Sequence, residues 1–163
     1  MKPEPRKKRP KFSLAHKDEQ MLQLVRETDK KILAVWAIDC VLRVLPYFEE
    51  KFPDDPRPRD AIVALQEWIK SGVFRMAVIR GASLASHAAA REVGEDNPAR
   101  SAARAAGQAV ATAHVATHSL GAALYAQQAV FRAADPADAE AAVAREREWQ
   151  YRRLLALRDL TEP

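Results

Sequence analysis

The feature that most constrains the fold is an alanine-rich stretch over residues 98–134. Alanine is the best helix former because it loses no side-chain entropy in a helix. A single helix over this stretch would be about 55 Å long at a rise of 1.5 Å per residue. Because that is long for a chain of 163 residues, we expect a break or a bend near Gly107 or Gly121.

The rest of the chain also has helical spacing of its apolar residues and lacks the alternation typical of strands. Asp96 or Asn97, followed by Pro98, marks the start of the alanine-rich helix. Pro46 should kink a helix that contains it, and Gly72 suits a helix C-terminus. Besides 98–134, the helices expected from these signals are about 13–27 with Ser13 as its cap, 29–51, 59–71, 74–93 and 136–158. Short connectors favour antiparallel neighbours, so we predict an all-α, up-and-down bundle of four to five main helices with an alanine-rich core.

The net charge of +4 is unevenly distributed along the chain. Residues 1–12 carry a net charge of +5, and the remainder carries −1. We interpret residues 1–12 as a basic disordered tail, because three prolines interrupt it, and 13–163 as a single helical domain. The alternative role for the tail is weak, sequence-blind contact with nucleic acid.

Cys40 is the only cysteine, so an intrachain disulfide is excluded. It lies in an apolar run, where a small buried thiol is the simplest explanation. The N-terminus has no apolar signal segment, and no apolar stretch is long and charge-free enough to cross a bilayer. These features predict a cytoplasmic protein without a membrane partner.

Three histidines are candidates for a metal site. His114 and His118 are four residues apart, so on one helix their rings would face the same way. With His87 from the preceding helix, or with Asp39, they could ligate a divalent transition metal. The alternative is that they make hydrogen bonds between helices and that no cofactor is bound, because the spacing of two histidines alone is weak evidence for a metal.

Charged residues in apolar surroundings form a second set of candidates. Asp39 and Arg43 are four residues apart in an apolar run, where a charge pair could fix helix register against Arg104 or a histidine. A polar ligand pocket is the alternative. Arg57 and Arg59 lie at an expected helix start, where they would either attract an anion or form ordinary salt bridges.

Four segments together are similar to the Imm-5-like family of proposed bacterial immunity proteins: 36–46, 53–62, 102–107 with 113–118, and 148–150. The resemblance covers about residues 30–157. It implies an all-α protein that binds and neutralises a cognate toxin, in the manner of a toxin–antitoxin pair, without catalysis. The positions it carries over, as partner contacts or as polar core, are Trp36, Asp39, Arg43, Arg57, Arg59, His87, Arg104, His114, His118 and Trp149.

An enzymatic alternative stays open. One histidine on an earlier helix followed by a later pair is similar to the DinB-like family of metal-dependent helical bundles. That resemblance implies a metal held by His87, His114 and His118, although His87 and His114 are closer in sequence than the family's pattern.

Overall fold

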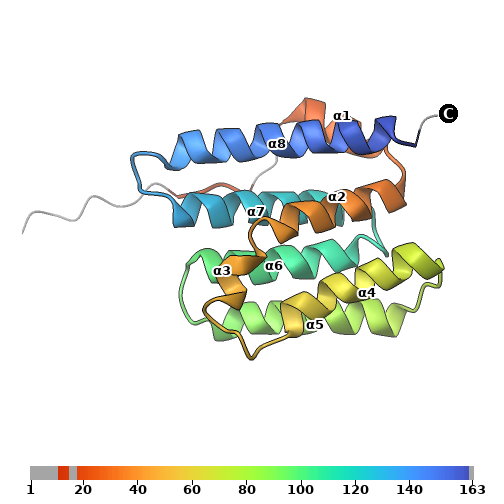
Figure 1. Cartoon of the computed structure of the whole chain (residues 1–163), viewed down its shortest axis with the longest axis horizontal. Helices are drawn as coiled ribbons and strands as arrows, with labels where there is room; N and C mark the ends of the chain where they lie inside the picture. Colours follow the sequence, from red (N-terminus) through yellow and green to blue (C-terminus); the bar gives the residue numbers. More distant parts are fainter. Residues whose placement is uncertain (1–10, 15–17, 162–163) are drawn as a thin grey trace, which may run out of the picture.

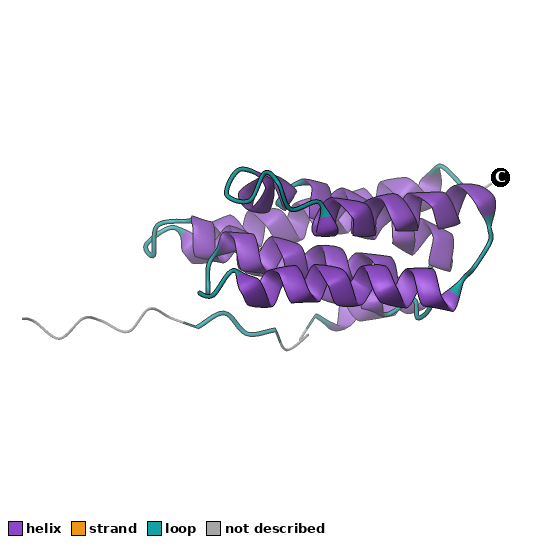
Figure 2. Cartoon of the chain, turned by 90° about the horizontal axis from the view of Figure 1, so that it is seen from below, coloured by secondary structure: helices purple, strands orange, loops and turns teal. Residues whose placement is uncertain are grey.

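The computed structural model describes residues 11–14 and 18–161. Most of the predicted basic tail, residues 1–10, therefore lies outside the described residues. The described part is helical and contains no strand, which confirms the all-α class (Figure 2). Its eight helices, more than the four to five expected, are α1 (Glu19–Arg26), α2 (Lys30–Leu42), α3 (Leu45–Glu49), α4 (Arg57–Ser71), α5 (Met76–Glu92), α6 (Pro98–Ala111), α7 (His118–Ala133) and α8 (Ala139–Asp159).

The last four long helices set the architecture. In Figure 1, α5, α6, α7 and α8 lie side by side, each packed against the next along the chain. Short connectors join them, so they alternate in direction. Helix α2 packs against α6, α7 and α8, and α4 packs against α5 and α6. Along residues 11–14 and 18–161, none of the helices has the combination of length and apolarity that crossing a bilayer requires.

Helix α2 is the centre of the core. Its apolar side chains are divided between two hydrophobic clusters, one towards α1, α7 and α8 and the other towards α4 and α6. This explains why the helix is apolar on nearly every side instead of along one stripe. The α2 side chains with no exposed surface are Leu33, Ala34, Trp36, Ala37, Cys40 and Val41.

Small residues let α5, α6 and α7 approach closely. Six alanines of α6 and four of α7 are buried. The hydroxyl of Ser86 donates to the Ala103 carbonyl at 2.7 Å, and that of Ser83 donates to the Gly107 carbonyl at 2.9 Å. Side chains this short reach a neighbouring backbone only when two helices are in close contact.

Pro46 begins a helix instead of kinking one. The helix expected over 29–51 is two helices, with α2 ending at Leu42 and the five-residue α3 beginning at Leu45. Pro46 occupies the first turn of α3, where a backbone N–H has no partner within the helix and its loss has no cost. The predicted single kinked helix was therefore wrong.

The alanine-rich stretch is also two helices. Asn97 caps α6, as expected, with its side chain accepting from the Arg100 amide at 2.9 Å. The chain then reverses over residues 112–117, and not at Gly107 or Gly121. Two antiparallel helices bury their alanine faces against each other, whereas one long helix would leave half of that face in water.

Two expected helix starts lie further along the chain than predicted. Residues 11–14 are not helical, and α1 begins at Glu19 with Asp18 as its cap, so Ser13 does not start it. Asp135 and Pro136 precede a turn in which the Asp138 amide donates to the Asp135 carbonyl at 2.8 Å, and α8 begins only at Ala139.

Candidate functional site

Asp39 of α2 and Arg43, which follows α2 as its C-cap, contact the last helix and not each other. Arg43 donates to both carboxylate oxygens of Glu146, from Nε at 2.7 Å and from Nη2 at 2.9 Å. Its guanidinium carbon also lies 3.9 Å from the centre of the Trp149 ring. The hydrogen bond to Glu146 raises the pKa of Arg43 above its ordinary value, although burial acts in the opposite direction. This is a bidentate ion pair that also stacks on an aromatic face.

Asp39 makes the second contact from α2 to α8. It accepts from Nε of Arg153 at 2.8 Å. The predicted pairing of Asp39 with Arg43, and of either with Arg104 or a histidine, was therefore wrong in its partners. The helical spacing was correct, but both side chains are directed to α8, the helix packed over this face of α2.

Buried amides link α2, α7 and α8 next to these ion pairs. The Trp36 indole donates to the Gln150 carbonyl at 2.8 Å. The side chain of Gln150 accepts from Gln127 Nε2 at 2.8 Å and donates to the Ala123 carbonyl at 3.0 Å. Trp36 is thus fully buried, with its indole N–H bonded to α8.

Sequence reasoning missed three polar residues of this region: Glu146, Gln150 and Gln127. Glu146 lies within the charged run 145–148 of α8, yet it is buried. A signal was present, since Val143, Glu146, Gln150 and Leu154 recur at spacings of three and four residues and so share one face.

The three candidate histidines lie in three different segments of the chain. His87 of α5 faces α6, where Nη1 of Arg104 lies 3.3 Å from its Nδ1. His118, at the start of α7, lies 2.9 Å from the Gln108 side-chain oxygen. Burial lowers the pKa of both histidines, helped by the charge of Arg104 at His87 and by His114 at His118.

His114 is not on the same helical face as His118. It lies in the turn between α6 and α7, is exposed, and stacks on Phe74 with ring centres 5.9 Å apart. In residues 11–14 and 18–161, no three His, Cys, Asp or Glu side chains gather closely enough to hold a metal. The predicted ligand set of His87, His114 and His118 does not form, because the turn separates the pair that a continuous helix would have aligned.

The arginines at the start of α4 are held by carboxylates. Arg57 donates to Asp55 at 2.7 Å and also to Glu92 of α5, and these bonds raise its pKa. Arg59 donates from Nε to Glu49 at 3.0 Å. Both guanidinium groups are thus engaged in ion pairs that join α3, α4 and α5.

Apolar side chains are exposed at the end of the bundle where α4 turns into α5. We call this the α4–α5 patch: its members, between 41% and 57% exposed, are Val73, Phe74, Met76, Val78 and Val115. The stacking of Phe74 on His114 connects the α4–α5 loop to the turn that contains Val115. Val73 and Val78 line a depression of about 400 Å³ whose wall includes Trp68.

Charged side chains lie next to the α4–α5 patch, where Arg75 and Glu67 line the same depression as Val73 and Val78. Lys70, Arg75 and Arg80 are exposed, and within the described part of the chain none of them is in an ion pair. Contiguous exposed apolar groups with a polar rim are typical of protein-binding surfaces. The sequence signal for this patch was the group of apolar residues Val73, Phe74, Met76 and Val78 where α4 turns into α5.

The fold and these surfaces define an all-helical protein whose interior polar groups join helices and whose α4–α5 end is accessible and apolar. The family model described as "Imm-5 like putative immunity protein" matches residues 23–157. The chain belongs to this Imm-5-like family. No curated protein and no solved structure matches it.

Proposed function

We propose that this protein is an immunity protein that neutralises a cognate toxin by forming a stoichiometric complex with it in the cytoplasm. Membership of the Imm-5-like family supports this function. The single observation that supports binding to another protein is the exposure of the apolar α4–α5 patch. The arginines first considered as part of a ligand pocket or an anion site are instead engaged in ion pairs, Arg43 with Glu146 and Arg57 with Asp55 and Glu92.

The chemistry of the patch indicates what its partner should look like. Val73, Phe74 and Val78 would be covered by an apolar segment of the toxin, because removing such area from water is the main favourable term in association. The unpaired cations Arg75 and Arg80 would face acidic groups around that segment. Complementary rim charges mainly accelerate encounter, so association should slow as salt is added.

The test is co-expression of the full chain with each toxin candidate encoded beside its gene. We expect one candidate to arrest growth alone, to be tolerated with this chain, and to co-elute with it as a complex of equal stoichiometry. Val78→Asp should abolish both protection and co-elution, since it places a charge within the patch. Leu160→Asp is the matched control, because Leu160 is 78% exposed beyond the last helix and outside the patch.

Two results would overturn the proposal. One is that no neighbouring gene product binds the chain or is tolerated through it. The other is equal loss of protection in Val78→Asp and Leu160→Asp proteins that are both folded by circular dichroism, which would remove the α4–α5 patch from the mechanism.

A further inference from the structure

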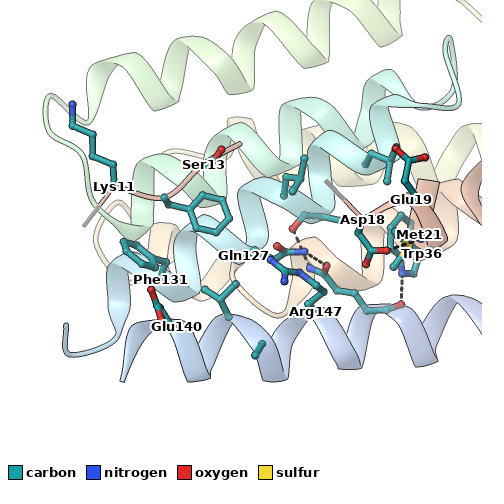
Figure 3. Close-up of a pocket in the computed structure, with 17 residues that line it drawn as sticks. Lys11, Ser13, Asp18, Glu19, Met21, Trp36, Gln127, Phe131, Glu140 and Arg147 are labelled. Carbon is teal, nitrogen blue, oxygen red and sulfur yellow. Dashed lines mark hydrogen bonds between the residues drawn. The ribbon is translucent and has the colours of Figure 1, made fainter. Parts of the chain in front are cut away.

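A cavity of about 720 Å³ lies between α7 and α8, away from the α4–α5 patch (Figure 3). Trp36 of α2 lines it, and Lys11–Ser13 and the first residues of α1 border it. Leu124 and Phe131 of α7 and Val143 of α8 contribute apolar walls. Its volume is within the range of sites that enclose a small molecule.

A buried acceptor in this cavity lacks a partner. Gln127 is only 5% exposed, and its Oε1 accepts no hydrogen bond in the described structure. Buried polar groups are normally paired, so an unpaired one in a cavity indicates a missing ligand group or a missing water.

The orientation of the Gln127 amide is fixed by its neighbours. Gln150 must donate to the Ala123 carbonyl, which can only accept, and this leaves Gln150 Oε1 to accept from Gln127 Nε2. Turning the Gln127 amide over would bring two oxygens together. The unpaired atom is therefore an acceptor, and the group that satisfies it must be an N–H or O–H donor.

A cation lines the same cavity as this acceptor. Arg147 is three residues before Gln150 on α8, so both side chains are on the same face of the helix. Figure 3 shows Arg147 extending from α8 into the cavity near Gln127. Within residues 11–14 and 18–161 it has no carboxylate partner. A free guanidinium group binds a carboxylate well, because its paired N–H donors match the two oxygens.

Carboxylates at the cavity margin limit the ligand's charge. Lys11 lines the cavity, as do the carboxylates Asp18, Glu19 and Glu140. The carboxylates would repel a dianion such as a phosphate monoester more strongly than a single carboxylate. The cavity thus offers one site for a monoanion, one acceptor for an N–H donor, and apolar walls.

We infer that this cavity binds a small organic carboxylate that carries an amide N–H next to the carboxylate and an apolar chain beyond the amide. Arg147 pairs with the carboxylate, Gln127 Oε1 accepts from the amide N–H, and the apolar chain lies between α7 and α8. Two sources share this chemistry, an N-acylated amino acid and the free C-terminus of an apolar peptide. The inference does not depend on toxin binding, since it concerns a different surface.

The test is isothermal titration of the full chain with N-decanoylglycine and with the acetylated tripeptide Leu-Leu-Gly. We expect saturable 1:1 binding of at least one probe and a raised Tm in its presence. Arg147→Gln should weaken binding by about tenfold or more, the value of a hydrogen-bonded charge. Decanoate, which lacks the N–H, should bind about threefold to tenfold more weakly than N-decanoylglycine.

The matched control is Arg145→Gln, which makes the same charge change on α8 at a residue that does not line the cavity. Its affinity should equal that of the unaltered chain. Tighter binding of the acylglycine assigns the site to acylated amino acids, and tighter binding of the tripeptide assigns it to peptide C-termini; both support the shared chemistry. The inference is overturned if neither probe binds, if decanoate binds as well as N-decanoylglycine, or if the two arginine variants lose equal affinity.

Discussion

Breaking the ion pair between Arg43 and Glu146 should destabilise the protein more when Arg43 is replaced than when Glu146 is replaced. The Glu146 side chain is 7% exposed and that of Arg43 is 40% exposed. Replacing Arg43 with Met leaves a buried carboxylate without its two donors, and such a loss costs about 3–5 kcal/mol in a fully buried pair. Because water reaches the arginine side of this pair, we expect about 2–3 kcal/mol for Arg43→Met. Glu146→Met leaves a cation that can turn to water and stay stacked on Trp149, so we expect about 1 kcal/mol.

The assay is urea unfolding followed by circular dichroism, compared at equal m values. The double variant, with Met at both positions, should be more stable than Arg43→Met alone, because no buried charge is left without a partner. The reasoning is refuted if Glu146→Met costs as much as Arg43→Met. It is also refuted if the double variant loses the sum of the two single effects.

Three further predictions follow from the described contacts. A Cβ on Gly107 would lie 2.7 Å from His87 Nε2, so Gly107→Ala should destabilise the protein by about 1–3 kcal/mol in thermal melts. A Cβ on Gly81 would have nothing within 4 Å, so Gly81→Ala should stabilise the protein by about 0.5–1 kcal/mol in the same melts. Burial, and secondly the charge of Arg104, lowers the pKa of His87 in the folded protein. As pH falls through about 6.5, the His87 side chain is therefore protonated in the unfolded chain before it is protonated in the folded one, and the free energy of unfolding decreases. His87→Gln should flatten that decrease in urea titrations from neutral to acidic pH, and an unchanged slope would contradict the assignment. Burial also raises the pKa of the Cys40 thiol, so it should react with a disulfide reagent only in denaturant; rapid native reaction would contradict its position in the core.

The sequence predicted the helical class because caps and apolar periodicity are local signals. Asn97 caps the start of α6 and Gly72 caps the end of α4, as expected, and Gly72 has a φ of +70°. The reversal over 112–117 was not predictable in this way, since no glycine or proline marks it. It depends on how two alanine faces pack against each other, which is a tertiary property.

For the site residues too, the local features were predictable from the sequence and the distant partners were not. That Asp39 and Arg43 needed partners followed from their apolar surroundings, but the partners Arg153 and Glu146 lie in a helix more than a hundred residues away. Local spacing carries no information on which distant element will pack over a given face. The α4–α5 patch and the cavity beside Gln127 likewise exist only once the helices are assembled.

The contacts between α2 and α8 have a consequence for how the chain is made. Trp36, Asp39 and Arg43 all bond to residues of the final helix, at sequence separations of 103 to 114. Until α8 has been synthesised, α2 lacks these polar partners in the nascent chain, even though the helices before α8 are already present. Loss of the last helix by premature termination should leave α2 without a place to bury its charges, so a truncated product would be a substrate for proteases and not a weakened version of the protein.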